Sequence, residues 1–345
     1  MKTQTFFLFS GLLIVAALGC SRDAYEGPLI DDLYGEFEVV DTLRISNLTP
    51  NFSEGGRVKF HSEFSKPVDW KLTITGQTSG SVKVFDGFSS SVDSNDVQWA
   101  GSISEVPFFQ LEICSVELTF PQEPDTMRGS LVITGVREHD GIVVADFESG
   151  LPDGAVVFHQ FSMNMTFETA SDVPLMGDTY FKMGGRMGWN EWLLGMLDVP
   201  LDCGSVEVPA DQFYLNLGIL SGIGGETASD QYLNILISES PEPFNDNLSN
   251  NGADIFQDGQ EVYKYQIRPV DWEGWQYVAI SYDMFEVKSL GGDNTRTPAN
   301  ITGIRLQCQS CPSANANCPE NADIDVRTDI DYVVFTEGVP LLDQE

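Results

Sequence analysis

The chain has 345 residues, of which 52 are Asp or Glu and only 18 are Lys or Arg, so its formal net charge at pH 7 is −34. Such a surface repels phosphate backbones, which argues against nucleic acid as a partner and suits divalent cations and neutral ligands. The simpler interpretation is that acidity keeps an exported protein soluble. The length is enough for two domains of ordinary size.

The first residues predict export. Lys2 precedes an apolar run, Phe6 to Leu18, whose thirteen residues are too few to cross a bilayer as a helix at about 1.5 Å each. The run therefore predicts a signal-peptide core. Its end, ALGC (residues 17–20), resembles the lipobox of bacterial lipoproteins, although Ala17 stands where leucine is usual. The resemblance implies that Cys20 is acylated and becomes the mature N-terminus. An ordinary signal peptide and an uncleaved anchor are the alternatives.

Residues 20–36 are polar, acidic and broken by Gly and Pro, which predicts a flexible tether. Short alternating runs follow. "WKLTITG" places Trp70, Leu72 and Ile74 on one face, and "CSVELTF" does the same for Val116 and its neighbours at alternate positions. Alternation with a period of two, with no long segment of period 3.6, predicts antiparallel strands. We expect residues 37–138 to form an immunoglobulin-like β-sandwich.

A polar turn, "REHDG" (residues 137–141), separates this region from longer and more aromatic runs. These runs are "DTYFKMGG", "QFYLNLGIL", "QYLNILISE", "EVYKYQIRPV", "WQYVAISY", "NITGIRLQC" and "DIDYVVF". They predict a second β-sandwich over residues 142–342. The Asn- and Asp-rich stretch 246–258 lacks the apolar content of a core and predicts a surface loop with Asx turns; a calcium loop is the alternative.

Three blocks of the second half resemble a known fold. "VVADFESG" (143–150) resembles the opening strand of the galactose-binding-like jelly-roll sandwiches, and "VDWEGWQYVAISYDMF" (270–285) resembles a late strand of family 11 carbohydrate-binding modules. "IDYVVFTEGVPL" (330–341) resembles the closing strand and tail of surface lipoproteins of the Bacteroidetes. The resemblance implies an all-β chain and a glycan-associated protein, lipid-anchored in the outer membrane and facing the cell surface. It names no polysaccharide or oligosaccharide.

The resemblance also implies a structural Ca²⁺ site, because the first and last strands of these sandwiches pair at an edge that often holds calcium. Asp146 and Glu148 in "DFE" and Asp329 and Asp331 in "DID" are the matching carboxylates. Calcium takes six to eight oxygen ligands, and acids at alternate strand positions can converge to supply them. The alternative is four solvated acids at strand ends.

Two aromatic pairs are candidates for ligand binding. Trp275 and Tyr277 share one face of a predicted strand, opposite Val278 and Ile280. Flat aromatic rings can stack on sugar rings at a small entropic cost, but aromatics at alternate strand positions more commonly belong to a core. "GWNEW" (residues 188–192) supplies a second pair, Trp189 and Trp192, between loop signals. For this pair the two interpretations are balanced.

Five cysteines remain when Cys20 is set aside, so at least one is unpaired within the chain. Cys311 and Cys318, across a Pro- and Asn-rich loop, are the favoured disulfide. Cys308 and Cys311 have C-x-x-C spacing, but no helix signal is present to lower a thiol pKa. Zinc would need a fourth ligand, and no histidine is near.

No catalytic motif is apparent. His61, His139 and His159 stand outside H-E-x-x-H settings, and no G-x-S-x-G elbow occurs. A non-catalytic glycan-binding lipoprotein is therefore the leading hypothesis, with three polar side chains offered as partners for the aromatics: Asp198, Asn216 and Asn234. The alternative is a structural or adhesion subunit of an outer-membrane complex. A glycoside hydrolase, which needs only two carboxylates at a suitable distance, is the third hypothesis.

Overall fold

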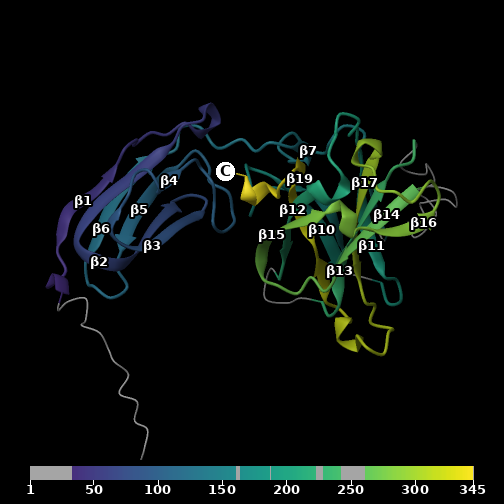
Figure 1. Cartoon of the computed structure of the whole chain (residues 1–345). Coiled ribbons are helices and arrows are strands. Elements are labelled where there is room, and N and C mark those ends of the chain that lie inside the picture. Colours follow the sequence, from purple (N-terminus) through teal and green to yellow (C-terminus); the bar gives the residue numbers. More distant parts are fainter. Residues whose placement is uncertain (1–32, 161–163, 187, 223–227, 242–260, 345) are drawn as a thin grey trace, which may run out of the picture.

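The computed structural model describes residues 33–160, 164–186, 188–222, 228–241 and 261–344, and they form two β-rich domains (Figure 1). The all-β prediction is confirmed, since strands dominate these residues and the helices between them are single 3-10 turns. Within the described residues, no helix has the length and apolar character needed to span a membrane. Cys20 and the loop 246–258 lie outside the described residues.

The strands of the first domain follow the alternation of the sequence. They are β1 (Val39–Ile45), β2 (Val58–Gly76), β3 (Val82–Val92), β4 (Gln98–Trp99), β5 (Ile113–Thr119) and β6 (Thr126–Val132), with the turn η2 (Phe52–Glu54). All six belong to one antiparallel sheet of order β1-β2-β5-β6, in which β3 and β4 also pair with β2. Buried and solvent-facing residues alternate along the whole 19-residue strand β2, as half-buried strands require.

The sheet of the first domain curls so that its end strands β1 and β6 meet. The backbone N–H of Leu43 lies 3.3 Å from the sulfur of Met127, and a Cβ on Gly129 would lie only 2.7 Å from Cδ1 of Ile45. A larger residue at position 129 would require the Ile45 side chain to move, because the opposite strand approaches closely. The enclosed core contains Trp70, Leu72 and further apolar side chains on the predicted face.

The second domain is a sandwich of two antiparallel sheets. The first, called the docking sheet, has the order β15-β12-β19-β10-β18, with β7 on β19 and β9 on β10. Its strands are β7 (Ile142–Ala145), β9 (Met165–Ala170), β10 (Tyr180–Arg186), β12 (Phe213–Ser221), β15 (Gly274–Ser281), β18 (Asp325–Arg327) and β19 (Asp329–Glu337).

The other sheet of the sandwich, called the outer sheet, has the order β16-β14-β13-β17-β11-β8. Its strands are β8 (Val156–His159), β11 (Leu193–Pro200), β13 (Gln231–Ser238), β14 (Glu261–Ile267), β16 (Glu286–Leu290) and β17 (Gly303–Ser310). The remaining turns are η3 (Ala210–Gln212), η4 (Tyr282–Met284), η5 (Pro298–Asn300), η6 (Pro319–Asn321) and η7 (Leu341–Asp343). Apolar side chains from alternate positions of both sheets, such as Leu217 and Ile235, fill the space between them.

The first domain packs on the outside of the docking sheet. Phe108 donates its backbone N–H to the carbonyl of Leu175 at 3.1 Å, and its ring meets that of Tyr332 edge-on, with centroids 5.5 Å apart. The C-terminal tail crosses the same junction, where Arg137 donates to the carbonyl of Gln344 at 2.7 Å (Figure 1). The outer sheet is thus the layer of the second domain turned away from the first domain.

Candidate functional site

Trp275 is not on an open face. Its indole N–H donates to the carbonyl of Val173 at 2.7 Å, and its ring meets Tyr180 edge-on with centroids 5.5 Å apart. It packs, half-buried, against the core of the first domain and the junction. Val278 and Ile280, on the other face of β15, pack into the core between the two sheets, as predicted.

Tyr277 lies deeper in the same junction. Its ring faces Phe108 at 5.4 Å and Tyr332 at 6.4 Å, and its hydroxyl donates to the carbonyl of Tyr332 at 3.1 Å. Burial raises the pKa of Tyr277 well above its ordinary value. Trp275 and Tyr277, candidates for ligand binding with a core role favoured, thus lie in the contact between the domains, which uses their aromatic faces.

No three of the four predicted calcium ligands have their ligand atoms within 4.8 Å of one another. Asp331 is fully buried, and its Oδ2 accepts the backbone N–H groups of Leu175 and Met176 at 2.8 and 3.1 Å. Its Oδ1 accepts the N–H of Tyr332 at 2.7 Å. Burial raises the pKa of Asp331 to about 7 despite these donors. The carboxylate thus anchors residues 175 and 176 to the junction.

Of the other three acids, two are hydrogen-bonded within the protein and one is exposed. Asp329, fully buried, accepts the N–H of Met183 at 2.9 Å and an N–H of Arg327 at 2.6 Å; burial raises its pKa to about 6. Glu148 accepts the N–H groups of Asp178 and Thr179, each at 3.0 Å, and Asp146 is exposed.

Only one group of three or more Asp, Glu, His or Cys residues in the described part of the chain has its ligand atoms within 4.8 Å of one another. It consists of Asp230, Cys311 and Cys318, and the two sulfurs are bonded to each other. Backbone N–H groups donate to both buried carboxylates, Asp329 and Asp331, and a calcium site at the first and last strands stays a prediction.

The structure joins Cys311 to Cys318 in a disulfide, with Cα atoms 6.1 Å apart. Cys114, Cys203 and Cys308 are buried free thiols, and burial raises the pKa of each to about 12. A thiol with so high a pKa is not a redox nucleophile.

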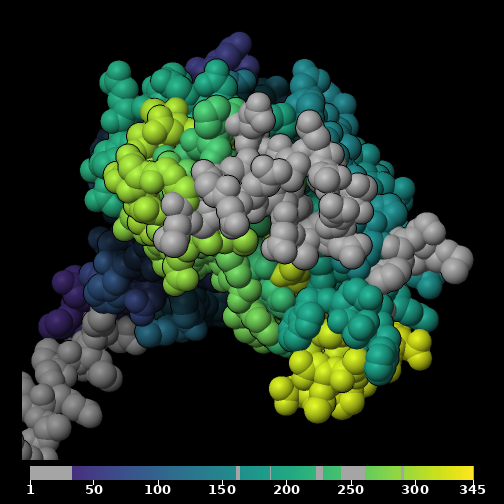
Figure 2. Space-filling view, turned by 90° about the vertical axis from the view of Figure 1, so that its right-hand side faces the viewer, coloured from purple at the N-terminus to yellow at the C-terminus, as the bar shows by residue number. Residues whose placement is uncertain are grey.

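The disulfide loop holds one end of the outer sheet. The buried side-chain amide of Asn321 donates to the carbonyls of Cys311 and Ser229, each at 2.7 Å, and its oxygen accepts the N–H of Ser229 at 2.7 Å. The loop also receives the segment that carries the two tryptophans, because Ala314 donates its N–H to the carbonyl of Trp189 at 2.8 Å. Figure 2 shows the two segments side by side, yellow against teal.

Aromatic side chains gather at this end of the outer sheet. Trp189 is 73 % exposed and Trp192, just before β11, is 37 % exposed. The Trp192 ring lies 6.5 Å from that of Tyr232 on β13. The Arg268 guanidinium lies 4.3 Å from the Tyr232 centroid and 5.8 Å from the Trp192 centroid, a cation–π arrangement. Asp230 forms a salt bridge with Arg268 and raises the pKa of that guanidinium.

Three side-chain amides continue from these rings across the outward face of β14, β13 and β17. Gln266 donates to Oδ1 of Asn234 at 2.7 Å, and Asn234 donates to Oε1 of Gln309. The Gln266 oxygen and the Gln309 amino group, at the two ends of this chain, have no hydrogen bond to a described residue. One acceptor and one donor are thus left for a ligand.

We call these side chains the aromatic–amide cluster: Trp189, Trp192, Tyr232, Asn234, Gln266, Arg268 and Gln309. Alternation along β13 already places Tyr232 and Asn234 on one face. The sequence carries no signal that β14 and β17 would flank them, because strand order is a tertiary property.

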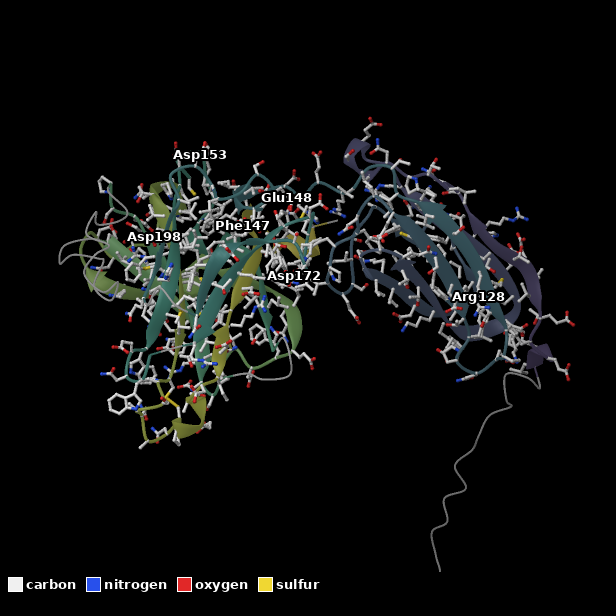
Figure 3. All side chains as sticks on the ribbon, turned by 180° about the vertical axis from the view of Figure 1, so that it is seen from behind. Arg128, Phe147, Glu148, Asp153, Asp172 and Asp198 are labelled. Carbon is white, nitrogen blue, oxygen red and sulfur yellow. A yellow bond between two sulfur atoms is a disulfide. The ribbon has the colours of Figure 1, made fainter. Side chains whose placement is uncertain are left out.

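The other two predicted polar partners have structural roles. Asp198 is paired with Arg305, and both side chains are almost completely buried. Burial raises the pKa of Asp198 against the effect of that guanidinium. Asp198 lies in the half of the second domain away from the first, whereas Glu148 and Asp172 lie toward it (Figure 3). Asn216 belongs to the junction, where it accepts the N–H of Leu341 at 2.9 Å.

No protein-family model matches the chain, and no curated protein matches its sequence. Among solved structures it is similar to the N-terminal CBM22-1-CBM22-2 tandem domain of Paenibacillus barcinonensis Xyn10C, with 10 % identity and a TM-score of 0.31, over 88 % of this chain and 94 % of that one. An exo-beta-agarase gives 15 % identity and a TM-score of 0.33, over 59 % of this chain and 25 % of that one.

A further similarity is to the CBM51-2 and INT domains of Clostridium perfringens ZmpB, with 10 % identity and a TM-score of 0.21, over 70 % of this chain and 42 % of that one. Similarity at this level transfers no function, so the aromatic–amide cluster has to be judged by its own chemistry.

Proposed function

We propose that this chain is a non-catalytic glycan-binding lipoprotein of the cell envelope, and that the aromatic–amide cluster holds the sugar. One observation carries the proposal: exposed tryptophans lie near a chain of amides whose two ends have no hydrogen-bond partner among the described residues. Sugar rings present an apolar face and a rim of hydroxyl groups. The aromatic rings are complementary to the apolar face of the sugar. The remaining acceptor and donor of the amide chain are complementary to its hydroxyl groups.

The position of the cluster also supports binding of an extended polymer. The docking sheet is covered by the first domain, whereas the cluster lies on the outward face of the outer sheet. The Arg268–Asp230 pair and the disulfide loop hold the aromatic groups in place before a ligand arrives, which lowers the entropy cost of binding.

In this proposal, acylation of Cys20 anchors the protein in the outer membrane at the cell surface, and residues 20–36 form the tether. The signal-peptide pattern and the lipobox resemblance support this part. Mass spectrometry of the N-terminal peptide tests it, because an acylated Cys20 adds the mass of its fatty acids. An unmodified N-terminus would refute the anchor and leave the glycan proposal standing.

Binding is tested on a glycan array with the purified chain, followed by incubation with each bound polysaccharide. We expect retention of at least one polysaccharide and no release of reducing ends. Release of reducing ends without an unsaturated product would instead establish a glycoside hydrolase.

An apolar patch on the first domain favours the second candidate function, a structural or adhesion subunit of an outer-membrane complex. Ile113 pairs with Val132 across β5 and β6, and Val132 donates its N–H to the carbonyl of Leu48 at 2.9 Å. These three side chains and Leu111 are 41 to 68 % exposed. Apolar side chains grouped on a surface are typical of protein contacts. Co-purification of membrane proteins with wild type and not with Ile113→Lys would favour this function.

A further inference from the structure

Glu239, which directly follows β13, has a buried carboxylate oxygen with no hydrogen-bond partner among the described residues. The residue is only 8 % exposed. Its Oε1 accepts the hydroxyl of Tyr282 at 2.6 Å and the N–H of Thr297 at 2.7 Å. Its Oε2 is inaccessible and accepts no hydrogen bond from the part of the chain that the structure describes. Such an unsatisfied group is costly in a folded protein and calls for a ligand or a bound water.

Two more acids stand around the same place. Glu261 accepts the hydroxyl of Tyr263 at 2.7 Å and the N–H of Asn294 at 3.0 Å, both on Oε1. Its Oε2 faces Gly292, where φ is +72° and a Cβ would lie 2.0 Å from that oxygen. Glycine at this position lets the loop close over the carboxylate, and the next residue of the loop is Asp293.

The charges at this place do not balance. Burial, with smaller contributions from the charges of Glu261 and Asp293, raises the pKa of Glu239 to about 7. The positive charge that the structure places beside them is Arg296, whose guanidinium lies 5.3 Å from the centroid of the Tyr263 ring. Three carboxylates against one guanidinium leave two negative charges when all three are ionised.

We propose that Glu239, Glu261 and Asp293 bind a divalent cation, and that the ion is Ca²⁺. Its ligands would be carboxylate oxygens and waters, the donors that Ca²⁺ prefers. Glu239 Oε2 is already desolvated and supplies the first ligand. The three carboxylates do not lie within 4.8 Å of one another, so the ion draws in the exposed side chain of Asp293. This site lies at the opposite end of β13 from Tyr232 and does not depend on the proposed glycan function.

Terbium luminescence and thermal unfolding test this site on the purified, chelator-treated chain. Tb³⁺ takes oxygen ligands as Ca²⁺ does, and the rings of Tyr263 and Tyr282, 5.8 Å apart, are placed to sensitise it. We expect tyrosine-excited Tb³⁺ emission that Ca²⁺ displaces. We also expect Ca²⁺ at a hundredfold excess over its Kd to raise Tm by about 5 °C.

Three variants locate the ion. Glu239→Gln keeps the acceptor used by Tyr282 and removes the charge, so we expect it to abolish both responses. Asp293→Asn, at an exposed position, should weaken both at least fivefold without affecting folding. Glu148→Gln, at the site expected from sequence, should retain both. Absence of emission and of a Tm shift in wild type, or equal responses in wild type and Asp293→Asn, would overturn the proposal, as would their loss in Glu148→Gln alone.

Discussion

Phe108 of the first domain and Tyr277 of the second meet edge to face, with ring centroids 5.4 Å apart and ring planes at 86°. The same phenylalanine ring contacts His139 and Tyr332 at 5.4 and 5.5 Å. Burial is the main reason that the pKa of His139 falls to about 4, so this histidine is neutral at physiological pH. The junction is thus an apolar contact closed by hydrogen bonds at its margin.

We predict that Phe108→Ala separates the two domains. Removing a buried phenylalanine costs about 3 to 5 kcal/mol, and the Phe108 ring contacts both Tyr277 and Tyr332 of the second domain. Calorimetry should show two unfolding transitions where wild type shows one, and small-angle scattering should show a larger radius of gyration. A variant that still melts in one transition, with an unchanged radius, would contradict this role of Phe108.

The raised pKa of Asp331 leads us to predict that the folded protein loses stability as the pH rises. Its pKa is raised from 3.8 to about 7 by burial, so between these values the folded protein holds a proton that the unfolded chain releases. The free energy of unfolding should therefore fall from about pH 4 to pH 7, by at most about 1.4 kcal/mol per pH unit for this group. Urea unfolding at several pH values in the presence of chelator measures the decline.

The variant Asp331→Asn isolates this contribution from the repulsion among the other acids. The variant removes the titration, so its decline between pH 4 and pH 7 should be shallower than that of wild type. Parallel declines in the two proteins would show that Asp331 is ionised throughout.

We predict that the disulfide between Cys311 and Cys318 supports both the stability of its loop and glycan binding. The bond closes a short loop, with Cys311 and Cys318 separated by 7 positions, and bonds that close loops of this size contribute about 2 to 3 kcal/mol. Cys311→Ser/Cys318→Ser should lose about that much stability and weaken glycan binding, because Trp189 and Asp230 are hydrogen-bonded to the loop. Unchanged glycan affinity in the double variant would show that the disulfide loop does not support the binding site.

The sequence predicted which face of a strand each residue lies on better than it predicted what packs against that face. Alternation placed Trp70, Leu72 and Ile74 on a buried face, and they are buried. It likewise placed Trp275 opposite Ile280, which is correct. Alternation could not tell that another domain would cover the outward face of β15, because that contact comes from residues more than a hundred positions away.

The surroundings of the predicted metal ligands could not be read from the sequence for a related reason. Four acids near strand ends predicted convergence, but Tyr332 has a left-handed backbone (φ 44°) beside an irregularity in the pairing of β19 with β12. There Asp331 accepts backbone N–H groups of residues 175, 176 and 332. Such local irregularity is not encoded in a period of two. The sequence also could not show that Glu239 has an oxygen with no partner among the described residues, since this depends on packing.

The most direct test of the central claim is affinity electrophoresis of the full chain in gels containing soluble polysaccharides such as xylan, β-glucan or pectin. Three proteins are compared: wild type, Trp192→Ala, and Trp275→Phe as a control in the domain junction. The account predicts that a polysaccharide retards wild type and the control alike, and that Trp192→Ala loses about 1 kcal/mol of binding free energy or more. Equal retardation of Trp192→Ala and wild type, with loss of binding in Trp275→Phe, would contradict it.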